Sequence, residues 1–156
     1  MNSSEVNNNL RVAVFTGSFD PFTIGHKSII DRALPLFDRI IIGVGINSAK
    51  SPWMPLEERL SAIRKLYEAD PRVVVDSFTG LASDFARGNG AKFILRGVRS
   101  VADFEYERNM ADANRLITGG DIETIFIPAL PELAPVSSSL VRELDHFGAP
   151  YQQFIP

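Results

Sequence analysis

The chain of 156 residues contains no cysteine. This absence excludes a disulfide framework, a thiolate zinc site and a cysteine nucleophile. No apolar run reaches the roughly 20 residues that a transmembrane helix needs, and the first nine residues lack the basic and apolar regions of a secretion signal. We therefore expect a flexible tail at residues 1–9, one domain at residues 10–156, no membrane contact and a cytoplasmic location.

An excess of charge of one sign is also absent. The 16 Lys and Arg against 19 Asp and Glu give a net charge of −3. This balance argues against a general nucleic-acid binder and requires any basic site to be local. The 45% hydrophobic and 22% charged fractions are ordinary for a folded globular domain.

Two common nucleotide motifs are missing as well. No G-x-G-x-x-G follows the first predicted strand, and no Gly-Lys-Ser/Thr marks a Walker A loop. The sequence also has no Ser/His/Asp arrangement and no cluster of His and Asp residues with metal-ligand spacing. We therefore expect neither a nucleophilic triad nor a metal held mainly by protein side chains.

Short runs rich in Val, Ile and Phe alternate with amphipathic segments. Such runs are typical of strands buried on both faces of a parallel sheet, and we predict them at residues 11–15, 39–46, 72–76, 92–95 and 123–127. The amphipathic segments predict helices at residues 24–37, 55–69, 81–89, 101–117 and 138–147, and Pro35 should break or kink the final turn of the first. The alternation predicts an α/β fold: a single-domain, Rossmann-like, doubly wound parallel sheet of five strands, order 3-2-1-4-5, with helices on both faces.

The segment from Gly17 to His26 gives the strongest signal for a site. A helix opens at Thr23, so His26 lies in its first turn, where unpaired backbone N–H groups and the helix dipole favour an anion such as phosphate. Gly17 and Gly25 allow a ligand to approach the backbone closely, and Ser18 adds a hydroxyl and an N–H. The alternative is a plain strand–turn–helix joint with a surface histidine.

Arg96 and Arg99 flank Gly97 after the fourth predicted strand. Two guanidinium groups at such a position suit a bidentate grip on phosphates. In a sheet of the predicted order, ligands bind beyond the carboxyl ends of strands one and four, so these arginines and His26 would share a crevice. The alternative is that the arginines pair with acids of the next helix, namely Asp103, Glu105 or Glu107.

Two further segments contribute candidates. Lys50, after the second predicted strand, is a third cation at the same sheet edge, although a loop lysine is usually only solvated. Residues 137–139 are all serine and begin the last helix, where they either form an anion site or simply cap the helix. Ser100, followed by Asp103, predicts a capping box on the fourth helix.

The three motifs together resemble those of one family. Residues 17–26 read G-S-F-D-P-F-T-I-G-H, which resembles the G-[ST]-F-D-P-x-T-x-G-H of bacterial phosphopantetheine adenylyltransferases, in the nucleotidyltransferase superfamily. Residues 96–99 and 102–107 are similar to its R-G-[LV]-R and A-D-F-E-Y-E, and residues 136–139 to its I-S-S-S. The resemblance covers nearly the whole chain, and T-x-G-H rather than H-x-G-H favours this family over nicotinate-nucleotide adenylyltransferases.

The resemblance implies transfer of AMP from ATP to 4′-phosphopantetheine, giving dephospho-coenzyme A and pyrophosphate. It implies three catalytic residues, which are His26 as the transition-state stabiliser, Lys50 and Arg99. The implied contacts of 4′-phosphopantetheine are Ser18, Lys50, Leu81, Ala82 and Arg96. Those of ATP are Ser18, Phe19, His26, Gly97, Val98, Arg99, Glu107, Leu133, Ala134, Pro135, Val136, Ser137, Ser138 and Ser139. Mg²⁺ carried largely by ATP and a homohexamer are implied as well.

The residues alone leave two rival functions open. One is another small adenylyl- or cytidylyltransferase, such as a nicotinate-nucleotide enzyme. The other is a non-catalytic ATP-binding module of the same sheet type, which would bind ATP without turnover. The second rival gives Lys50, Arg96 and His26 no shared purpose.

Overall fold

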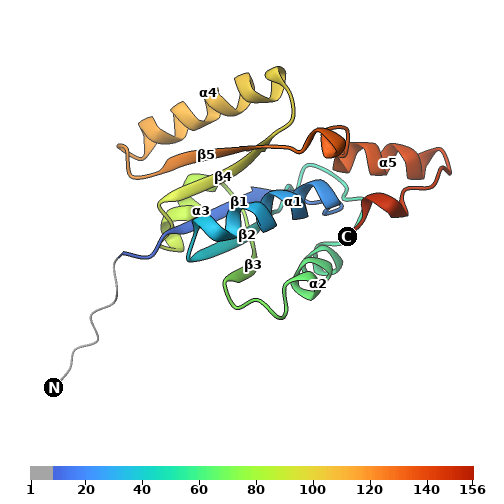
Figure 1. Cartoon of the computed structure of the whole chain (residues 1–156), viewed down its shortest axis with the longest axis horizontal. Helices are drawn as coiled ribbons and strands as arrows, with labels where there is room; N and C mark the ends of the chain where they lie inside the picture. The colour runs from blue at the N-terminus through green and yellow to red at the C-terminus, as the bar shows by residue number, and fades with distance from the viewer. Residues whose placement is uncertain (1–8) are drawn as a thin grey trace.

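The computed structural model describes residues 9–156 (Figure 1). In this part of the chain, five parallel strands form a sheet of order β3-β2-β1-β4-β5. The strands are β1 (Val12–Gly17), β2 (Arg39–Gly45), β3 (Val73–Phe78), β4 (Phe93–Val98) and β5 (Glu123–Pro128). The predicted strand order is confirmed, and every predicted strand is present.

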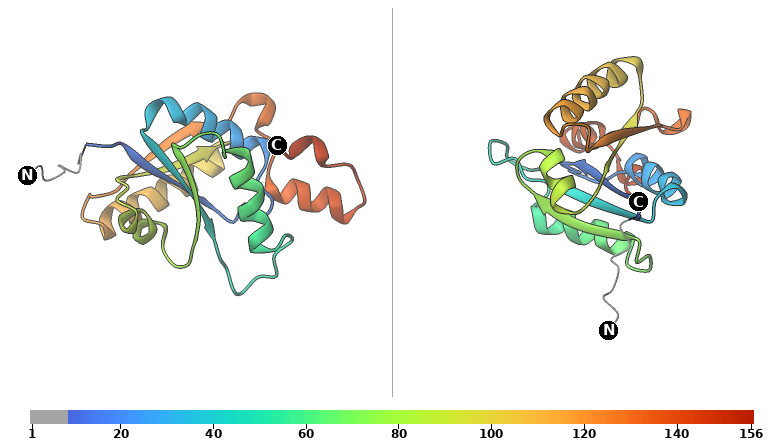
Figure 2. Two further views of the ribbon diagram at one scale, coloured as in Figure 1. Left: turned by 90° about the horizontal axis from the view of Figure 1, so that it is seen from below. Right: turned by 90° about the vertical axis from the view of Figure 1, so that its left-hand side faces the viewer.

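Helices alternate with the strands along the chain. They are α1 (Ile24–Ala33), α2 (Leu56–Leu66), α3 (Ala82–Gly88), α4 (Val101–Ile117) and α5 (Ser138–His146), with the 3₁₀ turns η1 (Leu34–Leu36), η2 (Pro131–Leu133) and η3 (Gln152–Phe154). α1 and α3 lie on opposite sides of the sheet (Figure 2). The larger core joins Phe15 of β1 with Ile30 of α1 and Ile63 of α2, and the smaller core joins Val14 with Ala86 of α3. The sheet is therefore doubly wound, as predicted.

Two predicted local features behave differently in the structure. Pro35 ends the first helix as expected: α1 stops at Ala33 and a single 3₁₀ turn follows. The capping box predicted for α4 forms only in half. The Ser100 hydroxyl accepts from the Asp103 backbone N–H at 3.2 Å, whereas the Asp103 carboxylate accepts from the backbone and guanidinium of Arg99 instead of returning to Ser100.

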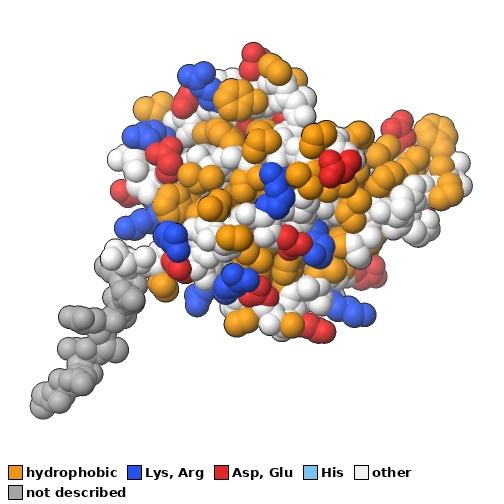
Figure 3. All heavy atoms as spheres, viewed as in Figure 1, with side chains coloured by type: hydrophobic (Ala, Val, Ile, Leu, Met, Phe, Trp, Pro, Cys, Tyr) orange, Lys and Arg blue, Asp and Glu red, His pale blue; other side chains and the backbone are white. Residues whose placement is uncertain are grey.

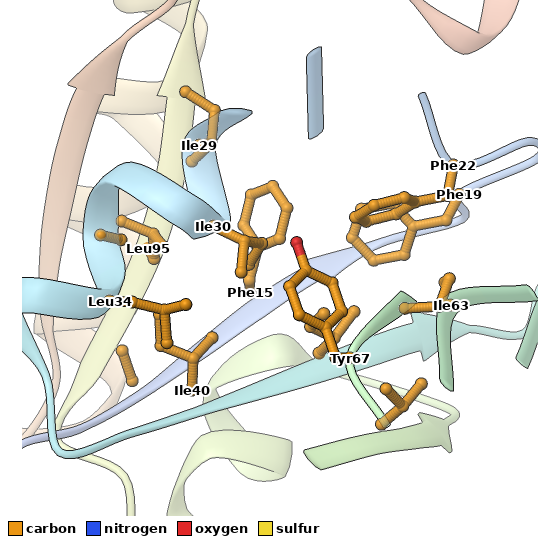
Figure 4. Close-up of a cluster of buried hydrophobic side chains, with 14 of the residues drawn as sticks. Phe15, Phe19, Phe22, Ile29, Ile30, Leu34, Ile40, Ile63, Tyr67 and Leu95 are labelled. Carbon is orange, nitrogen blue, oxygen red and sulfur yellow. The ribbon is translucent and has the colours of Figure 1, made fainter. Parts of the chain in front are cut away.

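The larger core lies directly under the junction of β1 and α1 (Figure 4). The rings of Phe15, Phe19 and Phe22 pack in series, with centroids 5.3 Å apart in each successive pair. Ile30 and Tyr67 close the same cluster from the helix side. Two aromatic side chains therefore anchor the loop after β1 in the core, so this loop has a fixed shape above the sheet.

The predicted tail at residues 1–9 lies, apart from its last residue, outside the described part of the chain. No helix within residues 9–156 is long and apolar enough to cross a membrane. On the face shown in Figure 3, acidic and basic side chains are interspersed among apolar ones.

Candidate active site

A cavity of about 450 Å³ opens at the carboxyl ends of β1 and β4, where the strand order reverses. Its walls come from the β1–α1 loop, the end of β4, the start of α4 and the start of α5. The predicted site residues that line it are Ser18, Phe19, His26, Arg96, Gly97, Arg99, Glu107, Leu133, Val136, Ser137, Ser138 and Ser139. The structure thus brings together the three sequence segments that carried the motifs.

His26 holds the start of α1 through a reciprocal cap with Thr23. The Thr23 backbone N–H donates to Nδ1 of His26 at 2.9 Å, and the His26 N–H donates to the Thr23 hydroxyl at 3.4 Å. A backbone N–H can only donate, so Nδ1 must be unprotonated and the ring proton sits on Nε2. His26 therefore offers one N–H donor, Nε2–H, in a ring that lines the cavity.

The charge state of His26 agrees with this tautomer. Burial, followed by the nearby positive charges of Arg96 and Arg99, lowers the pKa of His26 from 6.5 to about 4. The ring packs on the aromatic core, with the centroids of Phe19 and Phe22 at 5.0 and 5.3 Å. At neutral pH the imidazole is consequently uncharged, and it acts toward an anion as a hydrogen-bond donor rather than as a cation.

Gly17 lines the cavity, and a second constraint acts at the same position. A Cβ here would lie 3.0 Å from Cε1 of Phe19, so a larger residue would also crowd the protein's own ring. Phe19 itself has φ = 48°, in the left-handed region that non-glycine residues seldom adopt. The chain makes this turn because the Phe19 ring folds back over Gly17 into the core.

Arg96 and Arg99 pair with acids of α4, as the alternative reading of the sequence predicted, and both also line the cavity. Their grip on phosphates stays a prediction. Arg96 makes a bidentate ion pair with Glu107 at 2.9 and 2.7 Å, and its third nitrogen donates to the Thr16 carbonyl at 2.6 Å. Arg99 donates to Asp103 at 3.1 Å. The partners are thus Glu107 and Asp103, not Glu105.

The start of α5 completes the cavity wall. Ser137 caps the helix, as the simpler reading of the serine run predicted, by accepting from the Leu140 N–H at 3.1 Å. Ser138 instead donates to the Pro21 carbonyl at 2.7 Å. Arg142 was not among the predicted site residues. It lines the cavity and donates to the Asp20 carbonyl at 2.8 Å and to the Ser139 hydroxyl at 3.2 Å. Its spacing of three residues from Ser139, on one helix face, was the available signal.

Six predicted site residues do not line this cavity: Lys50, Leu81, Ala82, Val98, Ala134 and Pro135. Lys50 lies in an exposed turn after β2, the strand beside β1, so it remains at the same edge of the sheet. Leu81 is 55% exposed at the N-terminus of α3, which begins at Ala82. Val98 ends β4 and the last two follow η2. The roles given to these six stay predictions.

The carboxylates around the cavity already have partners. Asp20 accepts from the backbone N–H groups of Trp53 and Met54, while Asp103 and Glu107 pair with the arginines. Within residues 9–156, no group of three or more His, Asp or Glu side chains is arranged to hold a metal ion.

Comparisons with known proteins place this chain in a family. Residues 14–144 match the family model described as cytidylyltransferase-like. The phosphopantetheine adenylyltransferase of Phocaeicola vulgatus is 51% identical over 147 residues, which are 94% of this chain and 96% of the relative. The chain belongs to the phosphopantetheine adenylyltransferase family. The phosphopantetheine adenylyltransferase of Cytophaga hutchinsonii is 40% identical over 146 residues, which are 94% of this chain and 97% of that relative.

Solved structures of more distant proteins share the fold of this phosphopantetheine adenylyltransferase family member. A bifunctional NMN adenylyltransferase/ADP ribose pyrophosphatase from Francisella tularensis superposes with a TM-score of 0.68 at 17% identity, over 94% of this chain and 45% of that protein. A Vibrio parahaemolyticus protein, provisionally assigned as a nicotinate-nucleotide adenylyltransferase, superposes with a TM-score of 0.66 at 17% identity. The match covers 94% of this chain and 86% of that protein. These likenesses agree with the predicted Rossmann-like, doubly wound fold.

Proposed function

We propose that the chain transfers the adenylyl group of ATP to the phosphate of 4′-phosphopantetheine, yielding dephospho-coenzyme A and pyrophosphate in coenzyme A biosynthesis. The observation that carries the proposal is the meeting, in one cavity, of a neutral imidazole at a helix N-terminus and two guanidinium groups. Such a set of donors suits phosphate groups. The names of relatives up to 51% identical supply the two substrates.

The reaction is a direct in-line displacement. An oxygen of the acceptor phosphate attacks the α-phosphorus of ATP, and the bond from that phosphorus to the bridging oxygen breaks, with its electron pair leaving on pyrophosphate. The protein need not supply a covalent nucleophile, so its contribution is positioning and stabilisation of charge.

His26 is the proposed stabiliser of the transition state. Its Nε2–H would donate to an oxygen on the α-phosphorus, where negative charge develops, and the N-terminus of α1 adds its dipole. Because the ring is neutral and Nδ1 is fixed by Thr23, the donor is held in place and no proton has to be lost or gained.

Arg96 is well prepared to bind the acceptor phosphate. A guanidinium group has five N–H donors, and three hydrogen bonds to Glu107 and Thr16 leave further N–H groups for a phosphate while holding the plane of the group fixed. Arg99 is more exposed and has a single side-chain bond to Asp103, so it is freer to move toward the triphosphate of ATP.

The remaining contacts complete the proposal. Lys50 joins Arg96 on the acceptor phosphate, with Ser18, Leu81 and Ala82 along the pantetheine path. ATP would contact the cavity-lining residues Ser18, Phe19, His26, Gly97, Arg99, Glu107, Leu133, Val136, Ser137, Ser138 and Ser139. It would also contact Val98, Ala134 and Pro135, which lie next to them in the sequence but do not line the cavity. Mg²⁺ would be held mainly by the triphosphate, in keeping with cavity carboxylates that already have protein partners, and would neutralise phosphate charge.

A homohexamer and a cytoplasmic location belong to the same proposal. Support for assembly comes from α4, a helix of 17 residues without a buried side chain in the isolated chain. Its exposed large apolar residues are Val101, Phe104, Tyr106, Met110, Leu116 and Ile117. Exposed apolar area of this kind is typical of surfaces that contact another chain.

The test is pyrophosphate release from ATP and Mg²⁺ with a panel of acceptors. We expect release with 4′-phosphopantetheine and none with nicotinate mononucleotide. Turnover with the nicotinate acceptor alone would instead support the rival adenylyltransferase. ATP binding without turnover on any acceptor would support a binding module and refute the proposal.

A further inference from the structure

Arg59 is a buried arginine on α2 that the catalytic proposal leaves without a task. Arg59 is only 7% exposed, and it forms no ion pair with a carboxylate of the described residues. Instead, Nε donates to the Met54 carbonyl at 3.0 Å and Nη1 donates to the Ser18 carbonyl at 2.8 Å. A buried charge is costly unless it is well hydrogen-bonded, so these two carbonyl bonds fix where Arg59 and its partners lie.

Asp20 makes the complementary connection from the other side. Its carboxylate, in a residue 9% exposed, accepts from the backbone N–H groups of Trp53 and Met54, each at 2.8 Å. Both backbone groups of Met54 are therefore hydrogen-bonded: its N–H donates to Asp20, and its carbonyl accepts from Arg59. Since Ser18 and Asp20 are two residues apart, the bonds form a closed ring that joins the β1–α1 loop to the segment before α2.

This ring is the main anchor of the segment that carries Lys50. Residues 47–52 are exposed, and Lys50 itself bonds only locally, its N–H donating to the Asn47 carbonyl. Among the described residues, the side-chain bonds that tie the segment between β2 and α2 to other elements are those of the ring and one from the Trp53 indole to Asp145 at 2.8 Å.

We propose that Arg59 and Asp20 are positioning residues for the acceptor substrate. They hold Met54 against the loop that carries Ser18, and thereby place the turn with Lys50 beside the end of β1, where the acceptor phosphate is to be bound. The inference rests on the proposed function. It assigns to Arg59 a role through Lys50, without contact between Arg59 and either substrate.

The test compares Arg59→Lys and Arg59→Met with the same changes at Arg64. Arg64 is a matched control because it lies on the same helix and also donates to a backbone carbonyl, that of Val75 at 3.2 Å, away from the cavity. Lysine keeps the charge but cannot span two carbonyls as a guanidinium does. We expect both Arg59 variants to raise KM for 4′-phosphopantetheine roughly 10- to 100-fold, with KM for ATP little changed, and the Arg64 variants to alter neither.

A double-mutant cycle with Lys50→Ala tests the route of the effect. If Arg59 acts through Lys50, adding Arg59→Met to Lys50→Ala raises the acceptor KM little further, because coupled residues are not additive. Should the Arg59 variants fail to fold, Asp20→Asn keeps the side-chain size with a single carbonyl acceptor, and it should raise the same KM.

The outcomes separate the two proposals. Suppose that the wild type turns over 4′-phosphopantetheine. The positioning role is then overturned if the Arg59 variants leave the acceptor KM unchanged, or if their effect multiplies with that of Lys50→Ala, while the proposed function stands. A wild-type chain without turnover on this acceptor overturns both.

Discussion

The protonation of His26 should make the stability of the fold depend on pH in a way that one substitution removes. Nδ1 of His26 accepts the Thr23 N–H at the start of α1, and it can do so only while it is unprotonated. Glutamine is one of the two residues typical of this third position of a capping box, and it does not titrate. His26→Gln therefore keeps an acceptor for the Thr23 N–H at every pH.

The size of the effect follows from the pKa of His26. The folded state lowers this pKa from 6.5 to about 4, which corresponds to about 3 kcal/mol at about 1.4 kcal/mol per pKa unit. Between these two pH values the unfolded chain binds a proton that the folded chain refuses. The stabilisation is therefore complete above pH 6.5 and is lost as the pH falls from 6.5 toward 4.

Urea unfolding of the wild type and of His26→Gln, followed by circular dichroism, measures this contribution. Carboxylates that titrate in the same range affect both proteins, so the difference between their free energies of unfolding isolates His26. We expect the wild type to lose about 3 kcal/mol relative to the variant between neutral pH and pH 4. A difference that stays constant, or that moves in favour of the wild type in acid, would show that the folded protein does not hold His26 neutral.

Three further changes test the site and the sheet. His26→Ala should lower kcat roughly 10²- to 10³-fold in the pyrophosphate assay, with a smaller effect on ATP binding, and a near-normal kcat would remove His26 from the mechanism. Arg96→Ala should raise KM for 4′-phosphopantetheine roughly 10- to 100-fold, whereas a rise for ATP alone would mean that the roles of Arg96 and Arg99 are exchanged. Gly43→Ala should cost about 1–3 kcal/mol of stability in urea, because its Cβ would meet the Phe85 ring at 2.5 Å; an unchanged midpoint would contradict that crowding.

Much of the fold could be predicted because parallel strands are buried on both faces. Their side chains then need no alternation, so the runs of Val and Ile in β1 and β2 are visible in the sequence without any partner being known. Short strands separated by helical segments leave few arrangements open, and the reversal of order between β1 and β4 fixed where a crevice would form. Proline 35 likewise acts through its own backbone, so its effect on α1 needed no tertiary information.

The rest of the site depends on contacts that no local pattern reveals. Arg59 sits in an amphipathic helix, where a charged residue is normally solvated, and its partner Ser18 is 41 residues away. Arg142 donates to the carbonyl of Asp20, which is 122 residues away in the sequence. The contact of the Phe19 ring with Gly17 depends on the tertiary core, so this additional reason for a glycine could not be predicted. Partners of the cavity arginines could be narrowed to three acids but not chosen among them, because the choice depends on the exact placement of α4.

The bonds from α5 to the β1–α1 loop have a consequence for the order in which the molecule is made. The carbonyl oxygens of Asp20 and Pro21 accept hydrogen bonds from Arg142 and Ser138, which are synthesised more than a hundred residues later. On the ribosome, the loop that leads to His26 therefore emerges before α5 and lacks the hydrogen bonds from Ser138 and Arg142 until α5 has been made. A nascent chain thus carries the whole first motif before the cavity is complete, and the cavity can be completed only after α5 has been synthesised.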